Sequence, residues 1–238
     1  MSSYASLTLH DRSSVKRWFQ RRRLRVAIEL LDASEESIAI CDYGAGNAEV
    51  SKHLATHFPN ARFVAFEPTP IFMEEARENV AGLDQIHLVA STSDIGDHSI
   101  DILYCLEVLE HLPLAETIAA LDEFDRILRP GGTAVIGVPV EIWIPALYRG
   151  LFRMTRRWGQ PDSTPLNIIR ATLGFPPKDR EMIPIATGIP YYHLHIGFDH
   201  RRLRRLLETR FRTMSATTSP FKAFGTLLNA ELYWVCRK

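Results

Sequence analysis

Short apolar runs alternate with longer segments of helical period over roughly the first 140 residues of the chain. Residues 37–41 predict a buried strand, because the run is short, largely apolar and bounded by polar residues. Beyond it, Val50, Leu54 and Phe58 recur every four residues and predict the inner face of a helix. The same patterns predict further strands at 62–66, 85–90, 99–105, 133–138, 214–218 and 228–236, and further helices at 13–31, 71–80, 114–128, 144–158 and 201–209.

This order of elements predicts an α/β fold, a doubly wound and mostly parallel sheet with helices on both faces. Residues 142–190 interrupt the order with prolines and aromatic residues, and we interpret them as a cap inserted after the fifth strand. Within the cap, the helix at 144–158 is expected to be amphipathic, with its arginines facing outward. The expected divisions are an N-terminal helical segment (1–36), a cofactor-binding core (37–141), the cap (142–190) and the end of the same sheet (191–238).

A glycine turn follows the first strand. Gly44 and Gly46 let the backbone turn sharply and approach a ligand, and Asp42 stands at the strand's carboxyl end, where open α/β sheets bind ligands. A dinucleotide site would place a glycine where Glu49 stands, and both Glu49 and Asp42 would repel a pyrophosphate. An acidic residue beside this turn suits a ligand with an amino group and hydroxyls.

The segment Asp42-Tyr43-Gly44-Ala45-Gly46 resembles the first motif of class I S-adenosylmethionine-dependent methyltransferases, with Ala48 where many members have glycine. Residues 106–113 and the sequence Arg-Pro-Gly-Gly at 129–132 resemble two further motifs, so the resemblance covers about residues 37–141. It implies a seven-stranded sheet of order 3-2-1-4-5-7-6 whose last strand is antiparallel. It also implies S-adenosyl-L-methionine as the cofactor.

The resemblance further implies which residues hold the cofactor. Glu67 lies 21 residues after Gly46, near the spacing at which an acid accepts hydrogen bonds from ribose hydroxyls. The residues expected at the cofactor are Asp42, Gly44, Gly46, Glu67, Pro68, Ser91, Thr92 and Leu106. The adenine contact is the least defined, because the usual acid after the third strand is displaced or replaced here.

Two histidines are the candidates for a general base, because the pKa of histidine lies near neutral pH. His111 follows the fourth strand, and His195 falls where relatives often place a histidine. Glu107, Glu110 and His111 are similar to the magnesium-binding segment of ubiquinone-biosynthesis O-methyltransferases and of small-RNA 2′-O-methyltransferases. The small-RNA enzymes add a later histidine, which His195 would match. The alternative, which we favour at this point, is that no metal binds and that these groups bond to nearby backbone.

The expected function is therefore methyl transfer to a small-molecule, lipid-linked or saccharide acceptor, with oxygen preferred over nitrogen and carbon. An RNA-modifying enzyme that uses the basic helices, and a non-catalytic cofactor-binding module, stay open as alternatives. A formal net charge of +0 argues against a large nucleic-acid footprint.

The expected location is the cytoplasm, with peripheral membrane contact left open, since the sequence has no apolar run long enough to span a membrane and no apolar signal core. The three cysteines, Cys41, Cys105 and Cys236, fall in predicted strands and are expected to be reduced core thiols. The oligomeric state is left open.

Overall fold

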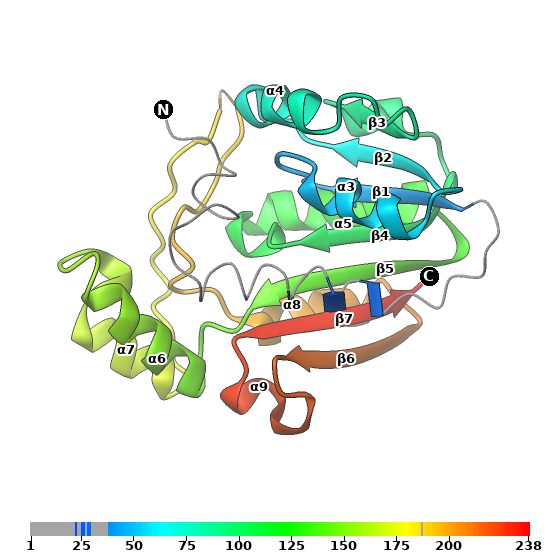
Figure 1. Cartoon of the computed structure of the whole chain (residues 1–238). Helices are drawn as coiled ribbons and strands as arrows, with labels where there is room; N and C mark the ends of the chain where they lie inside the picture. Colours follow the sequence, from blue (N-terminus) through cyan, green and yellow to red (C-terminus); the bar gives the residue numbers. More distant parts are fainter. Residues whose placement is uncertain (1–21, 23–24, 27, 30–37, 187) are drawn as a thin grey trace. The chain divides into compact units, whose positions relative to one another are not determined.

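The computed structural model describes residues 22, 25–26, 28–29, 38–186 and 188–238 (Figure 1). Most of the predicted helix at 13–31, and with it the proposed N-terminal segment, lies outside the described residues. Ser37, the predicted start of the first strand, lies outside them as well.

Strands and helices alternate through the first half of the chain, as predicted. The elements in chain order are β1 (Ala39–Tyr43), α3 (Glu49–His57), β2 (Arg62–Phe66), α4 (Pro70–Asn79), β3 (Ile86–Val89), η1 (Thr92–Asp94), β4 (Ile100–Leu106), η2 (Leu109–His111), α5 (Leu114–Ile127), β5 (Leu128–Pro139), α6 (Trp143–Met154), η3 (Pro161–Ser163), α7 (Pro165–Thr172), α8 (His200–Glu208), β6 (Thr213–Ser219), η4 (Lys222–Phe224), α9 (Gly225–Leu228) and β7 (Glu231–Arg237).

The strands form one sheet of order β3-β2-β1-β4-β5-β7-β6, which is the predicted order. The pairs β1–β2, β1–β4 and β2–β3 are parallel, and Figure 1 shows β7 running opposite to β5 and β6. The mixed seven-stranded sheet confirms the predicted fold class.

Two compact units divide the chain. The first comprises Met1–Leu106, Asp122–Ile136 and Val235–Lys238, and the second comprises Glu107–Leu121 and Gly137–Trp234. The core of the first unit contains fully buried side chains such as Ile40, Leu54, Phe63 and Tyr104. Leu54 comes from the predicted inner face of α3, so the four-residue period identified that face correctly.

Three boundaries differ from the prediction by three residues or more, and the first is the end of α6, at Met154 instead of at residue 158. The fifth strand was expected to begin at Thr133, but β5 begins at Leu128 and includes the Arg-Pro-Gly-Gly segment at 129–132, where Gly131 adopts a φ of 77°. The last strand was expected to begin at Leu228, but Gly225–Leu228 forms α9 and β7 begins at Glu231. An apolar run as short as Leu227-Leu228 fits a helical turn as well as a strand, which is why the pattern did not separate them.

Two arginines of helix α6 point inward, although all its arginines were predicted to point outward. Arg149 and Arg153 point inward and pair with the buried carboxylate of Glu141, at 3.0 Å and 2.7 Å. The helix instead presents apolar side chains to solvent, among them Leu151 and Phe152. A buried carboxylate requires a cationic partner, and this requirement overrode the usual inward orientation of an apolar stripe.

No helix in the described part of the chain is long and apolar enough to cross a membrane. Cys41, Cys105 and Cys236 are buried and form no disulfide. Burial raises the pKa of the Cys236 thiol to about 12, so this thiol is protonated at neutral pH.

Candidate functional site

The glycine turn after β1 is held against the end of β2. The N–H groups of Gly44 and Ala45 both donate to the carbonyl oxygen of Phe66, each at 2.9 Å. Gly44 and Gly46 adopt φ angles of 75° and 57°, a region that side chains with a Cβ rarely enter. The positive φ angles at positions 44 and 46 therefore explain why both of these predicted cofactor residues are glycines.

Ala48 adopts the same left-handed conformation, with a φ of 58°, and it forms the N-cap of α3. This is the position at which the sequence departs from the related motif by having alanine. A left-handed conformation costs a residue with a Cβ about 1–2 kcal/mol. The backbone at residue 48 therefore keeps the conformation that a glycine would adopt, and the Cβ of Ala48 makes this conformation less favourable.

Asp42 is buried at the carboxyl end of β1, with 2% of its surface exposed. Its Oδ2 accepts hydrogen bonds from the hydroxyl of Ser51 at 2.8 Å and from the N–H of Ser51 at 3.2 Å. Burial raises the pKa of Asp42 to about 6, while the two hydrogen bonds from Ser51 oppose this rise. The protein thus keeps a desolvated carboxylate beside the turn at neutral pH, at an energetic cost to the fold.

Glu67 connects the turn to the end of β2. Its Oε2 accepts from the N–H of Gly46 at 2.8 Å, and its Oε1 accepts from the N–H of Thr69 at 2.8 Å. Burial raises its pKa, and these hydrogen bonds counteract the rise. Two of the residues predicted at the cofactor are therefore in direct contact, although 21 positions separate them in the sequence.

The other predicted cofactor residues follow the ends of parallel strands. The register pairs Tyr43 with Phe66 and Phe66 with Val89, so β1, β2 and β3 end at one edge of the sheet. Pro68, Ser91, Thr92 and Leu106 come after β2, after β3 and at the end of β4. Ser91 is exposed and Thr92 is half-buried, and the hydroxyl of Ser91 accepts from the N–H of Ser93 at 3.2 Å.

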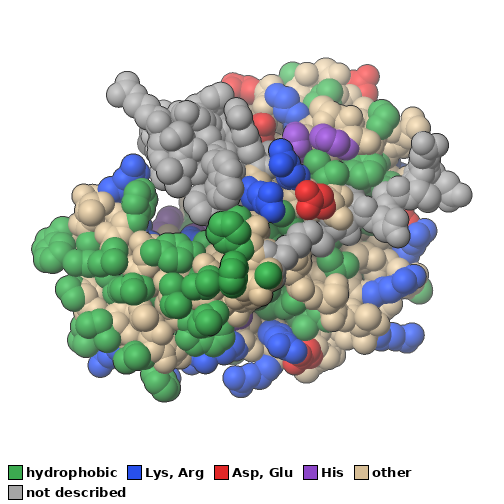
Figure 2. Space-filling model, turned by 60° about the horizontal axis from the view of Figure 1, so that its bottom comes forward, with side chains coloured by type: hydrophobic (Ala, Val, Ile, Leu, Met, Phe, Trp, Pro, Cys, Tyr) green, Lys and Arg blue, Asp and Glu red, His purple; other side chains and the backbone are tan. Residues whose placement is uncertain are grey.

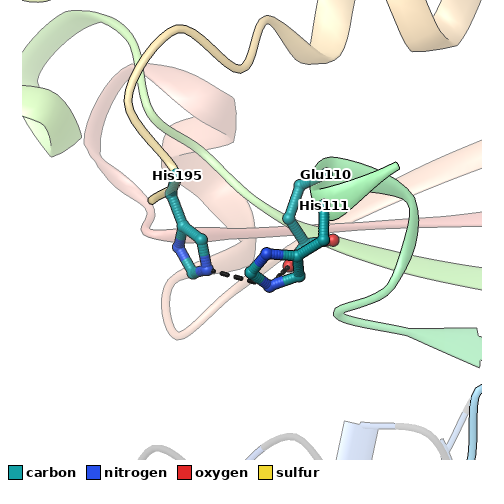
Figure 3. A group of neighbouring side chains, drawn as sticks. All are labelled: Glu110, His111 and His195. Atoms are coloured by element: carbon teal, nitrogen blue, oxygen red, sulfur yellow. Dashed lines mark hydrogen bonds and ion pairs between the residues drawn. The ribbon is translucent and has the colours of Figure 1, made fainter. Parts of the chain in front are cut away.

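A second group of side chains lies in the other unit. Glu110, His111 and His195 each offer a ligand atom within 4.8 Å of the others (Figure 3). The Nε2 atoms of His111 and His195 are 3.2 Å apart, and Nε2 of His111 is 3.6 Å from Oε1 of Glu110. The structure thus brings together the two histidines predicted as general-base candidates, which are 84 positions apart.

The positions of protons in this group follow from its hydrogen-bond partners. Nδ1 of His111 is 2.6 Å from the carbonyl oxygen of Tyr192, which can only accept, so Nδ1 of His111 carries a proton. Burial, and then the neighbouring His195, lower the pKa of His111 to about 3, so this ring is neutral and its Nε2 is an acceptor. The 3.2 Å between the two Nε2 atoms is therefore a hydrogen bond when His195 carries a proton on Nε2, and it leaves a place for a cation when His195 does not.

Glu141 is the partner that sequence reasoning missed. Its Oε1 lies 3.4 Å from Nδ1 of His195, and Arg153 donates two hydrogen bonds to its carboxylate, at 2.7 and 2.8 Å. Burial alone would raise the pKa of Glu141, but the cations of Arg149 and Arg153 outweigh it and hold the pKa well below its usual range. A charged carboxylate therefore faces the second ring nitrogen of His195. The only signal in the sequence was an acid directly after an apolar strand.

Glu107, one of the metal-ligand candidates from the sequence, is not a member of this cluster in the described residues. Its backbone has a φ of 58°, and its N–H donates to the carbonyl oxygen of Gly137 at 2.8 Å. Glu110 and His111, the other two candidates, are members, and His195 takes the third place.

Comparisons with known proteins point in one direction. Residues 41–136 match a family model described as a methyltransferase domain. The trans-aconitate 2-methyltransferase of Methylobacterium radiotolerans is 28% identical over 124 residues, which cover 51% of this chain and 46% of that protein. The chain spans less than half of the length of the curated relatives it matches.

Solved structures share the fold at low sequence identity. A SAM-dependent methyltransferase from Archaeoglobus fulgidus matches with a TM-score of 0.61 and 12% identity, and the match covers 100% of both chains. The 1,6-didemethyltoxoflavin-N1-methyltransferase of Burkholderia thailandensis, solved with S-adenosylhomocysteine bound, matches with a TM-score of 0.54 and 16% identity over 93% of this chain and 80% of that one. At these identities the two likenesses establish the fold.

Proposed function

Because residues 41–136 match a methyltransferase domain and solved SAM-dependent methyltransferases share the fold, we propose that the chain transfers a methyl group from S-adenosyl-L-methionine to a hydroxyl oxygen of a small acceptor, either free, lipid-linked or saccharide. S-adenosyl-L-methionine supplies the methyl group on a sulfonium with a good leaving group. A hydroxyl acceptor must lose its proton during the transfer. The observation that carries the proposal is the close pair of His111 and His195, supported by Glu141.

The two histidines differ in their suitability as a base. His111 has a pKa of about 3, which makes it a weak proton acceptor. His195 is the better candidate, because the carboxylate of Glu141 faces its Nδ1 and favours the tautomer with the proton there, which leaves Nε2 to take the acceptor's proton. In this proposal His195 is the base, His111 accepts a hydrogen bond from the protonated ring, and Glu141 is a positioning residue.

The glycine turn and its two acids hold the cofactor in this proposal. Gly44 and Gly46 allow its close approach, Glu67 accepts from its ribose hydroxyls, and Asp42 supplies negative charge for its amino group. Pro68, Ser91, Thr92 and Leu106 line the nucleoside portion. Each oxygen of Glu67 accepts one backbone N–H in the structure and retains a lone pair for a further donor.

A small acceptor is favoured over RNA. Two of the four arginines in the predicted basic helix, Arg149 and Arg153, are engaged with the buried Glu141 and are thereby withdrawn from a phosphate-binding surface. Trans-aconitate, the acceptor in the name of the curated relative, is a small organic acid, and this supports a small molecule over RNA as the acceptor.

The cluster also fits a divalent metal ion. Nδ1 of each histidine faces an oxygen acceptor, as is usual for metal-ligating histidines, and both Nε2 atoms lie close to the carboxylate of Glu110. An ion held by Glu110, His111 and His195 would lower the pKa of an acceptor hydroxyl. It would also separate the two Nε2 lone pairs when neither ring carries a proton on Nε2.

The test is a transfer assay with methyl-labelled cofactor and a panel of hydroxylated small molecules. On any acceptor found, His195→Gln should lower kcat about 10²–10⁴-fold, the usual contribution of a general base, and cofactor affinity by calorimetry should stay unchanged. His87→Gln, at an exposed position on β3, is the matched control. An unchanged kcat in His195→Gln would overturn the assignment of the base.

Three further outcomes separate the alternatives. Full activity in EDTA, together with no thermal stabilisation by Mg²⁺, Mn²⁺ or Zn²⁺, would discard the metal. Methylation of RNA, with binding that weakens steeply as salt rises, would replace the small acceptor. Cofactor binding without turnover on any acceptor would favour the non-catalytic module.

A further inference from the structure

The outer side of helix α6 is apolar over its whole length. Its exposed large hydrophobic residues recur at three- and four-residue intervals and so form one stripe: Ile144, Leu147, Tyr148, Leu151 and Phe152. The inward side carries Arg149 and Arg153 on the buried Glu141. Soluble helices normally bury the apolar stripe and expose the charges, so α6 is inverted with respect to that rule.

Neighbouring helices extend this stripe into a face. Helix α7 packs against α6 so closely at Gly150 that an added Cβ would lie 2.6 Å from Cγ1 of Ile168, and the hydroxyl of Tyr148 donates to the carbonyl of Leu228 in α9 at 3.4 Å. We call the exposed large hydrophobic residues of these segments the apolar face: Ile144, Leu147, Tyr148, Leu151, Phe152, Trp158, Leu166, Ile169, Leu173, Phe175, Phe221, Phe224, Leu227 and Leu228. They are 14 of the 18 large hydrophobic residues that are exposed in the described part of the chain. Figure 2 shows the resulting concentration of hydrophobic side chains on one side of the molecule.

Exposed charge around the apolar face is positive. Residues 143–175 contain five arginines and one acid, a net charge of +4, and the acid, Asp162, is buried at 2.7 Å from Arg157. Arg156 and Arg170 are exposed, and the guanidinium of Arg156 lies 4.6 Å from the centre of the Phe152 ring. Residues 220–229, which include α9, contain no acid. The rim thus presents cations next to apolar and aromatic side chains.

From this combination we propose that the apolar face docks on an anionic lipid surface. Apolar and aromatic side chains that insert at the boundary of headgroups and acyl chains, with arginines that reach anionic headgroups, are the features of an interfacial helix. A second copy of the chain fits the same face less well, because it would bring two cationic rims together with no exposed acid in these segments to offset them. The proposal is independent of the acceptor and of the base.

The experiment measures sedimentation of the full chain with vesicles of phosphatidylcholine, alone or mixed with phosphatidylglycerol. We expect binding to the mixed vesicles that weakens as salt rises, because the arginine contribution is screened. Leu151→Ser with Phe152→Ser should weaken binding about tenfold or more, since two half-exposed apolar side chains no longer insert. Ile71→Ser with Leu114→Ser, at exposed apolar positions outside the face, should leave binding unchanged.

Charge is tested separately. Arg156→Glu with Arg170→Glu should weaken binding to the mixed vesicles about tenfold or more. Arg202→Glu with Arg205→Glu makes the same change in net charge on α8, outside the face, and should have a much smaller effect.

A spectroscopic readout identifies the face directly. Trp158 is 72% exposed, so its emission should shift to shorter wavelength on binding, and Trp158→Phe should remove that shift. The proposal is overturned if the wild-type chain does not bind mixed vesicles, or if the face and control variants bind equally. It is also overturned if the chain is a dimer in solution that the Leu151→Ser, Phe152→Ser variant dissociates, since the face would then join two copies.

Discussion

Replacing Asp42 by asparagine should stabilise the cofactor-free protein at neutral pH while weakening cofactor binding. Asp42 is almost completely buried, and burial raises its pKa from its ordinary value of 3.8 to about 6. A folded-state pKa above the unfolded one favours folding when the group is protonated, and this advantage disappears as pH rises through the folded value. At neutral pH the native state therefore keeps a carboxylate that would be more stable in water.

The size of the effect follows from the difference between the two pKa values. About two pH units correspond to about 3 kcal/mol of unfolding free energy as an upper limit, and we expect about 1–3 kcal/mol near pH 8. Near pH 4.5 most of this cost is absent, so the stability advantage of Asp42→Asn should grow by roughly 2 kcal/mol between these two values. Asparagine keeps an oxygen that accepts from Ser51.

Urea unfolding of the cofactor-free protein at the two pH values measures the advantage, and calorimetry measures cofactor affinity. Asp84→Asn, at an exposed position, controls for the loss of a negative charge. A stability difference that does not change with pH would refute the reasoning, as would an Asp42→Asn protein that is less stable near pH 8. Unchanged cofactor affinity would remove Asp42 from the binding site.

Three further predictions test the turn, the ribose contact and the packing of α6. Glu67→Ala should weaken cofactor binding by about 1–3 kcal/mol, because it leaves polar partners without an acceptor, and calorimetry that finds no change would exclude the ribose role. Gly46→Val should abolish cofactor binding, because a β-branched residue is strained at a φ of 57°; Gly82→Ala, at a φ of 82° with open space around it, is the control that should bind normally. Gly150→Ala should lower the unfolding free energy by about 1–3 kcal/mol through overlap with Ile168, and Ile168→Ala, which removes all three overlapping carbons, should cost less in the Gly150→Ala protein than in the wild type; equal urea midpoints for wild type and Gly150→Ala would contradict the contact.

The parts of the fold that could be predicted from the sequence are those governed by local rules. The turn at Gly44 and Gly46 needs residues without a Cβ, so its position is visible in the sequence. Glu67 and Gly46 were both predicted to lie at the cofactor, and they are in contact in the structure. This part was predictable because the carboxyl ends of parallel strands meet at one edge of the sheet. The mostly parallel sheet followed from the alternation of elements, and the strand order followed from the resemblance to a known family.

The parts that could not be predicted depend on partners that are distant in the sequence. The inward turn of Arg153 is explained by Glu141, twelve positions earlier, whose burial no local pattern indicates. The pairing of His111 with His195 was anticipated only through the resemblance to metal-binding methyltransferases, since nothing local specifies a contact across 84 positions. The role of Glu141 at His195 depends on the same long-range packing.

The two sides of α6 have different roles in these proposals, and the carboxylate of Glu141 connects them. Its solvent side has the apolar and aromatic residues of the proposed lipid contact. Its inner arginines pair with the carboxylate of Glu141, and this carboxylate also contacts the ring of His195. A shift or rotation of this helix at a bilayer would therefore change the field and the alignment at that ring. Binding to a lipid surface and proton transfer at His195 would then be coupled through the buried carboxylate of Glu141.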